Sequence, residues 1–144
     1  MESITRKAQI VVATAKPLRQ NKFLLLKTNQ ERGGFWQNCT GKIEDAEDFL
    51  TGAIREVQEE TGLENNNILE VIDLGLEHHF LDRWKRNVHE KAYLILVNKP
   101  WDVIIDHHEH QDFKWVDHND LNPDCVKYIG NYEALKIASE RLKG

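Results

Sequence analysis

Hydrophobic and polar positions along the chain follow two different periods, which separate strand-like segments from helix-like ones. Five segments are short, rich in aliphatic and aromatic residues, and bounded by turn-forming or charged residues, which is typical of β-strands. In the last of them, Phe113 and Trp115 occupy alternate positions and therefore share one face. The predicted strands are Ala8–Lys16, Lys22–Thr28, Ile68–His79, Ala92–Val97 and His110–Val116.

The connections between these strands are also indicated by the sequence. A turn that contains Pro17 joins the first two strands. Residues 30–40 carry the pair Gly33-Gly34 and are predicted to form a loop. Residues 80–91 are charged, carry Trp84, and fit a hairpin loop.

Between residues 46 and 61 the apolar positions recur at the spacing of an amphipathic α-helix. Asp45 is the predicted N-cap and Gly62 the predicted C-cap. Gly52 lies inside this helix, where it costs roughly 1 kcal/mol relative to Ala, so we expect close packing there. The predicted apolar face consists of Phe49, Leu50, Ala53, Ile54 and Val57.

A second helix is predicted to open at Asn122-Pro123 and to run toward the end of the chain. The order of strands, helix, strands and helix suits a mixed sheet covered by helices on both faces, which is an α/β fold. The apolar side of this helix is formed by Val126, Ile129, Leu135, Ile137, Ala138 and Leu142.

Length and composition bound the class of protein. The chain has 144 residues, of which 40% are hydrophobic, so we expect a single domain over residues 1–144. No stretch is long and apolar enough for a membrane span, and residues 1–7 lack the apolar core of a signal peptide. The two distant cysteines, Cys39 and Cys125, suggest free thiols, so a cytoplasmic location is expected.

Acidic residues are concentrated in one segment. Residues 41–63 hold seven acidic and two basic side chains, and the resulting charge of −5 equals the net charge of the whole chain. The remainder is balanced and has no basic stripe, so binding to duplex nucleic acid is not expected. An anionic segment on a neutral scaffold points to divalent cations as its partners.

Three glutamates in this segment share one side of the predicted helix. Glu56, Glu59 and Glu60 are spaced i, i+3, i+4, and carboxylates within about 6 Å repel one another unless cations or protons intervene. Oxygen ligands select Mg²⁺ or Mn²⁺, which take their remaining ligands from substrate phosphates. Arg55 precedes Glu59 by four residues and can hold that carboxylate by a charge-assisted hydrogen bond. Glu47 is near enough to join the same network.

The same segment fits a longer pattern, G-x5-E-x7-R-E-U-x-E-E-x-G-U with U apolar, which runs from Gly41 to Leu63 without a mismatch. This pattern resembles the signature of the Nudix hydrolases. The resemblance implies an α/β/α sandwich with a mixed central sheet, in which the segment forms a loop, a helix and a second loop. It also implies hydrolysis of a nucleoside diphosphate linked to another group, with Mg²⁺ or Mn²⁺ as the cofactor.

The resemblance further assigns roles to residues of this segment. Glu56 and Glu60 would be direct metal ligands, and Glu59 would be a third ligand or would orient the attacking water. Gly41 would offer its backbone carbonyl to the metal, and Arg55 would brace the carboxylates.

Glu109 is the predicted catalytic or metal-binding residue outside this segment, because several Nudix branches have a glutamate in the matching loop. Glu90 is the alternative for the same role. Three histidines flank Glu109, but adjacent loop histidines do not point to one centre and no cysteine accompanies them, so zinc is not expected. We predict that these histidines are solvent-exposed; they are His107, His108 and His110.

A second set of short motifs resembles the dihydroneopterin triphosphate pyrophosphatase branch, whose members also accept (d)NTPs. The resemblance implies that Lys7 and Thr40 contact substrate and that residues 79–83 border the phosphate or base pocket. Arg83 and Arg86 suit a triphosphate, and Trp36 is either a stacking platform or part of the core. The motifs are Phe35-Trp36-Gln37, Thr40-Gly41, Arg86-Asn87, Glu90, Glu109-His110 and Phe113-Lys114-Trp115.

The first hypothesis is therefore Mg²⁺-dependent hydrolysis of a nucleoside or pterin triphosphate to a monophosphate and pyrophosphate. Other Nudix substrates stay open: a dinucleoside polyphosphate, a nucleoside diphosphate sugar, or an RNA 5′-triphosphate end, which would favour a more basic surface. A nucleotide-binding module without turnover is a further alternative, although such modules usually lose a glutamate of the motif and this chain keeps them all. The expected partner is a small nucleotide or pterin triphosphate, and a homodimer is possible.

Overall fold

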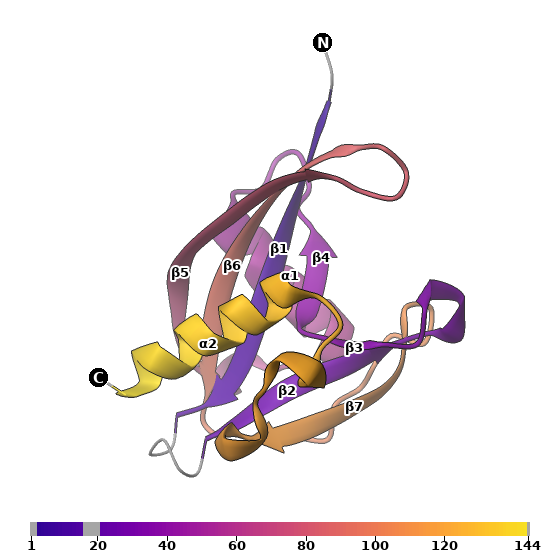
Figure 1. Cartoon of the computed structure of the whole chain (residues 1–144). Helices are drawn as coiled ribbons and strands as arrows, with labels where there is room; N and C mark the ends of the chain where they lie inside the picture. The colour runs from indigo at the N-terminus through magenta and orange to yellow at the C-terminus, as the bar shows by residue number, and fades with distance from the viewer. Residues whose placement is uncertain (1–2, 16–20, 144) are drawn as a thin grey trace.

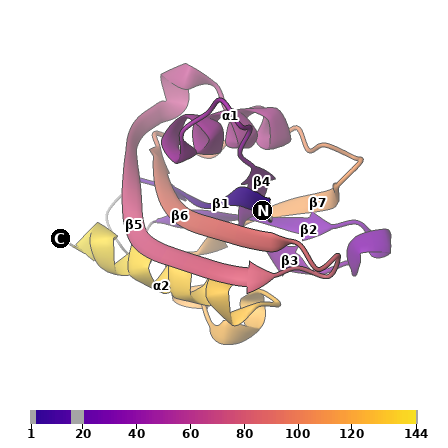
Figure 2. The ribbon, with the colours of Figure 1, turned by 90° about the horizontal axis from the view of Figure 1, so that it is seen from above.

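The computed structural model describes residues 3–15 and 21–143. In this part of the chain, a mixed seven-stranded sheet lies between two α-helices, α1 (Phe49–Thr61) and α2 (Ile129–Lys143). Figure 1 shows the strands from one side, and Figure 2 shows from above that the two helices cover opposite faces of the sheet. The predicted α/β/α sandwich is therefore confirmed.

The sheet has one parallel strand pair at its centre, formed by β1 and β6, and its other pairs are antiparallel. The main order is β3–β2–β1–β6–β5, while β4 pairs with β1 and β7 pairs with β2. The strands are β1 (Ile4–Thr14), β2 (Lys22–Thr28), β3 (Trp36–Gln37), β4 (Cys39–Lys42), β5 (Ile68–Leu81), β6 (Asn87–Val97) and β7 (His110–Asp117). Short 3₁₀ helices cover Gln30–Arg32, Asn65–Asn67, His118–Asp120 and Pro123–Cys125.

The central strand β1 supplies both hydrophobic cores of the sandwich. Successive side chains of a strand point to opposite faces, so Ile10 and Val12 pack in the core under α1 while Val11 and Ala13 pack in the core under α2. A strand that is buried on both faces has apolar residues at consecutive positions, which explains the run of apolar residues from Ile10 to Ala13. The polar Gln9 is an exception: it is also buried, on the α2 side.

Helix α1 starts later than the sequence predicted. The N-cap is Asp48, whose side chain accepts a hydrogen bond from Thr51 N at 2.7 Å, so the prediction of Asp45 was wrong. The preceding turn is held by Glu47, whose Oε1 accepts from Glu44 N, and this keeps Glu47 outside the helix. The predicted C-cap, Gly62, is confirmed: its φ of 72° is left-handed and its N–H donates to Gln58 O.

The buried face of α1 largely matches the prediction. Ala53 and Val57 are fully buried, but Leu50 is 45% exposed, because it lies in the first turn, at the edge of the packed face. A Cβ at Gly52 would lie 2.6 Å from Ile43 Cδ1, so the expected close packing at this glycine is confirmed.

Several strands extend into segments that were predicted to be loops. β5 and β6 pair as far as Leu81 and Asn87, which reduces the predicted loop 80–91 to residues 82–86. The predicted loop 30–40 contains β3 and the start of β4, since their backbones pair with β2 and β1 although they are too short to show a period. β1 begins at Ile4 and ends at Thr14, and the predicted turn at Pro17 lies outside the described residues.

The start of the C-terminal helix was also predicted wrongly. Pro123–Cys125 forms a single 3₁₀ turn capped by the side chain of Asn122, and α2 begins at Ile129. Between them the chain bends through residues 126–128, where Lys127 N donates a hydrogen bond to Trp36 O of β3. Val126 is buried in the core before the helix begins, whereas Ile129 is 65% exposed.

Both cysteines are unpaired, as predicted; Cys39 is buried and Cys125 is partly exposed. Among the described residues, neither α-helix combines the length and the hydropathy that crossing a membrane requires.

Candidate active site

Arg55 on α1 holds the acidic residues of the helix together. Its guanidinium binds Glu47 with two nitrogens, at 2.7 and 2.8 Å, and Nη1 binds Glu56 at 3.1 Å and Glu59 at 3.0 Å. Nη2, one of the two nitrogens that bind Glu47, also donates to the backbone carbonyl of Lys42 at 3.0 Å. The predicted bond from Arg55 to Glu59 is present, and Arg55 also ties the helix to the end of β4.

The charges of this cluster are strongly coupled. The hydrogen bonds from Arg55 lower the pKa of Glu47 from its usual range to about 2, and the same bonds raise the pKa of Arg55. Glu56 differs, because partial burial raises its pKa more than Arg55 lowers it. Glu56 is therefore a half-buried carboxylate whose charged form a second cation nearby would stabilise.

Gly41 on β4 lies directly against Glu56. A Cβ at this position would overlap the Glu56 side chain, so only glycine leaves room for the carboxylate beside the strand backbone. This close approach brings the backbone of Gly41 and the carboxylate of Glu56 to one place, as the metal-site hypothesis requires.

A second acidic group lies at the C-terminal end of α1. Ligand atoms of Glu60, Glu109 and His110 lie within 4.8 Å of one another. Burial, followed by the neighbouring Glu60 carboxylate, raises the pKa of Glu109 to about 7. Glu109 also forms an ion pair with Arg32 at 3.3 Å. The loop before β7 thus places the predicted Glu109 beside the helix carboxylates, although it lies 49 residues after Glu60.

His110 is buried, and the prediction that it is solvent-exposed was wrong; His107 and His108 are exposed as predicted. His110 Nδ1 lies 3.4 Å from Glu60 Oε2, and His110 Nε2 lies 3.3 Å from Gln37 Nε2. A bulge in the pairing of β2 with β7 shifts the register next to His110. The bulge turns this side chain to the α1 face of the sheet, which strand alternation in the sequence could not reveal.

The residues present fit a hard divalent cation. Glu60 Oε2 is buried without a hydrogen-bond partner in the described part of the chain, and such a group is costly unless a ligand satisfies it. Glu56, Glu60 and Glu109 supply oxygen donors, which Mg²⁺ and Mn²⁺ prefer. Glu59, whose side chain is 60% exposed, faces solvent beside them.

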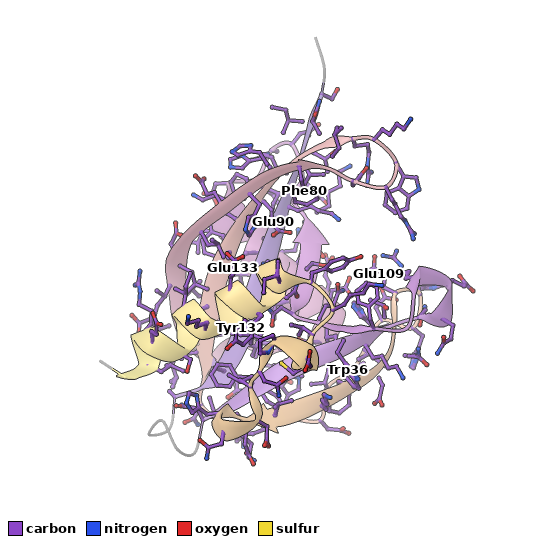
Figure 3. All side chains as sticks on the ribbon, viewed as in Figure 1. Trp36, Phe80, Glu90, Glu109, Tyr132 and Glu133 are labelled. Carbon is purple, nitrogen blue, oxygen red and sulfur yellow. The ribbon has the colours of Figure 1, made fainter. Side chains whose placement is uncertain are left out.

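A pocket of about 630 Å³ opens on the α2 side of the sheet. The predicted substrate residues Lys7, Thr40 and Arg83 line it, together with Glu90, the alternative to Glu109. Figure 3 shows Phe80 and Glu90 on β5 and β6, toward the N-terminal part of α2, where Glu133 is labelled. Gln37 lines the pocket as well, so the pairs Gln37–His110 and His110–Glu60 connect the pocket to the acidic group.

Two predicted substrate residues lie away from this pocket lining. Arg86 binds Asp82 at 2.7 Å and lies over the ring of Trp84. Trp36 packs against the core under α2, with Lys114 Nζ 4.2 Å from its ring centroid. Of the two roles considered for Trp36, this position favours the core, and substrate contact by either residue stays a prediction.

Carboxylates on one helix, a glycine fitted against one of them and a nearby pocket that contains Lys7 and Arg83, on an α/β/α sandwich, are the features of phosphoanhydride hydrolases with an acidic helix. The NUDIX domain model matches residues 6–135, so the chain belongs to the Nudix hydrolase family.

Two of the similar proteins support this assignment. The chain is 34% identical over 124 residues to a dihydroneopterin triphosphate diphosphatase of Haemophilus influenzae, covering 81% of this chain and 77% of that protein. It is 29% identical over 137 residues to an RNA pyrophosphohydrolase of Pelagibacter ubique, covering 87% and 85%. A match of 37% over 97 residues to an octanoyltransferase of Myxococcus xanthus spans 65% of this chain and 26% of that protein.

Solved structures show the same fold. A C. elegans Ap4A hydrolase complex superimposes with a TM-score of 0.75 at 25% identity and covers 96% of this chain and 97% of the other. The E. coli dihydroneopterin triphosphate pyrophosphohydrolase superimposes with a TM-score of 0.78 at 20% identity and covers 94% and 95%. The chain is therefore an enzyme, a Nudix hydrolase that acts on phosphoanhydrides.

Proposed function

We propose that this enzyme hydrolyses a nucleoside or pterin triphosphate, with Mg²⁺ or Mn²⁺, to a monophosphate and pyrophosphate. The observation that carries the proposal is the link from the pocket to the acidic group through Gln37 and His110. Lys7 and Arg83 supply positive charge in the pocket where phosphates would lie, and the carboxylates lie beyond this link.

The chain's own residues have distinct roles in this reaction. Glu56, Glu60, Glu109 and the Gly41 carbonyl would hold the cation. Arg55, itself held by Glu47, fixes the helix carboxylates Glu56 and Glu59 by one bond each. Bound Mg²⁺ or Mn²⁺ supplies charge neutralisation at the phosphoryl oxygens.

Water attacks phosphorus, the bridging P–O bond to the leaving pyrophosphate breaks, and the water proton passes to a carboxylate. Glu109 and the exposed Glu59 are the two candidates for this base. Glu109 takes this role only where Glu56, Glu60 and the Gly41 carbonyl hold the cation without it, and Glu59 takes it otherwise.

A second candidate is hydrolysis at an RNA 5′-triphosphate end, which the resemblance to the Pelagibacter ubique RNA pyrophosphohydrolase supports. The net charge of −5 and the absence of a basic stripe in the sequence weigh against a polyanionic substrate of this length. The cytoplasmic location and the homodimer stay predictions.

The test is product analysis with Mg²⁺ on dihydroneopterin triphosphate, the eight (d)NTPs, Ap4A, ADP-ribose and 5′-triphosphorylated RNA. We expect pyrophosphate release to be fastest on the pterin or a (d)NTP and to be lost in Glu60→Gln. Glu70→Gln is the matched control, because Glu70 is exposed on β5 outside the site. Faster turnover of RNA would favour the second candidate, and no turnover despite Mg²⁺ binding would contradict the proposal.

A further inference from the structure

A chain of buried amide side chains connects α2 to the floor of the pocket. Asn38 is fully buried, its backbone N–H donates to Asn131 Oδ1 at 2.8 Å, and its Nδ2 donates to Asn131 O at 3.1 Å. The same Nδ2 donates to Gln9 Oε1 at 2.7 Å. Gln9, only 1% exposed, donates through Nε2 to Glu90 Oε1 at 3.4 Å. Hydrogen bonds through Asn131, Asn38 and Gln9, which are distant in sequence, thus position the carboxylate of Glu90.

The direction of each hydrogen bond in this chain is fixed by its ends. The backbone carbonyl of Asn131 only accepts, so the amide nitrogen of Asn38 must face it. Gln9 must then present its oxygen to Asn38 and its nitrogen to Glu90. The carboxylate of Glu90 therefore receives hydrogen bonds in this network and donates none.

Glu90 has an acceptor left for a ligand. Its side chain is 15% exposed at the pocket, and its Oε1 is approached by Gln9 Nε2 and by His78 Nδ1, both at 3.4 Å. Within residues 3–15 and 21–143, no hydrogen bond to Oε2 is found, and Oε2 is not among the buried unpaired atoms. A ligand that reaches Glu90 must bring N–H donors.

The other residues that line the pocket indicate what kind of ligand it can bind. Phe80, Leu81 and Tyr128 give it apolar walls that suit a flat ring, and Lys7 and Arg83 give it cations that suit phosphate. Glu133 also lines the pocket, but it is exposed and lacks the support that Gln9 gives to Glu90. Asp82 lines the pocket too, but both of its carboxylate oxygens already accept hydrogen bonds, from Trp84 N and from Arg86. The pocket thus combines apolar walls, cations and the positioned carboxylate of Glu90.

We propose that Glu90 determines specificity by accepting the two neighbouring N–H groups of a 2-amino-oxo ring, as in guanine or a pterin. A carboxylate matches a ring N–H beside an exocyclic amine with two parallel hydrogen bonds. Adenine places a ring acceptor beside its amine, and hypoxanthine lacks the amine, so both leave an acceptor of Glu90 unpaired. This inference rests on the proposed function, because it names the substrate class for the same pocket.

The test compares GTP with ITP, which differ only in the 2-amino group. We expect kcat/KM with Mg²⁺ to favour GTP by about ten- to hundredfold, the discrimination of one bidentate contact, mainly through KM. In Glu90→Gln the ratio should fall to within about threefold, since an amide offers one acceptor in place of two. Glu90→Asp keeps the carboxylate and should restore part of the preference. Dihydroneopterin triphosphate, in parallel, distinguishes a pterin from guanine.

Glu133→Gln is the matched control, because it neutralises the other glutamate of the pocket and should keep the GTP/ITP ratio. An equal loss of kcat on both nucleotides in Glu90→Gln, with the ratio unchanged, would overturn the inference and favour Glu90 as the general base. The Kd values of GTP and ITP in EDTA give a readout independent of turnover. Equal Kd values in a protein that hydrolyses triphosphates would refute the inference and leave the proposed function intact. Tighter binding of GTP than of ITP without any hydrolysis would support the inference and contradict the proposed function.

Discussion

Arg55 Nε lies 2.7 Å from Glu47 Oε2, and its Nη2 lies 2.8 Å from Glu47 Oε1, so one guanidinium binds both carboxylate oxygens. Glu47 precedes the helix, yet it has the most complete contact with Arg55. The pair therefore closes the turn before α1 and leaves Nη1 for Glu56 and Glu59. Glu47 thus fixes the side chain of Arg55, which in turn holds Glu56 and Glu59.

This pair predicts how stability depends on pH. The pKa of Glu47 is lowered to about 2 in the folded protein from its ordinary value of 4.5, so the stabilisation is fully present above about pH 4.5. It is lost as the pH falls through about 2, because protonated Glu47 no longer binds Arg55 as an anion. We expect the difference in unfolding free energy between wild type and Glu47→Gln to be constant from pH 5 to 7 and to shrink toward pH 2.

Urea titrations of both proteins at several pH values measure this difference. Glu44→Gln is the control, since the Glu44 carboxylate has no bond to Arg55 among the described residues. A difference that grows on acidification would contradict the role assigned to the pair.

Gly41 predicts a second outcome. In Gly41→Ala the new methyl group would overlap Glu56, so either the carboxylate or β4 must move. We expect activity to fall strongly, and overpacking of this kind costs about 1–3 kcal/mol of stability. Activity assays and thermal unfolding measure the two effects. Gly75→Ala is the contrast for activity alone: a Cβ at residue 75 would meet no atom within 4 Å, but the left-handed φ of 74° strains any side chain there, so we expect lower stability with activity retained. Full activity in Gly41→Ala would show that the close contact is dispensable.

His110 predicts a third outcome, because its two nitrogens face different partners. The Glu60 carboxylate only accepts, so Nδ1 must carry the proton to be attracted to it, and Nε2 then accepts from Gln37. His110→Asn keeps an N–H near the Nδ1 position and should lose less than tenfold in kcat. His110→Gln places its amide toward Gln37 instead and should lose about 10- to 100-fold, as for partners of ligating groups.

Mn²⁺ titration by calorimetry provides a second readout for these two variants, and circular dichroism checks that they fold. Equal losses in His110→Asn and His110→Gln would contradict the assignment of the proton to Nδ1.

The buried amide chain predicts a loss of stability. Asn38→Leu removes the donors to Asn131 O and Gln9 Oε1, and each buried polar group left unpaired costs about 1–3 kcal/mol. We expect a lower midpoint in urea and a higher KM, since Gln9 would no longer be held against Glu90. Gln111→Leu removes one partly buried bond, to Thr28 O, and should have the smaller effect. Equal midpoints for the two variants would show that the chain carries little stability.

Helix α1 shows most clearly which features of the structure could be predicted from the sequence. Its spacing of apolar and acidic residues predicted the helix, its C-cap, the shared side of Glu56 and Glu60, and the bond from Arg55 to Glu59. These are local features, set by the 3.6-residue period, so nearby residues suffice to predict them. The N-cap was misplaced because Asp45 and Asp48 are equally suitable by type, and only the bonds of Glu47 select Asp48.

The tertiary structure alone decided which distant residues meet. A bulge opposite Thr28 turned His110 inward to Glu60, against the prediction that it is exposed, and strand alternation gives no sign of a bulge. Gln9, Asn38 and Glu90 are separated by 29 and 81 residues in the bonds that join them, and no periodicity links such positions. The sequence by itself determined the family and its acidic helix, because both depend on local spacing. The pocket and the position of Glu90 in it depend on contacts that form only when the sheet is assembled.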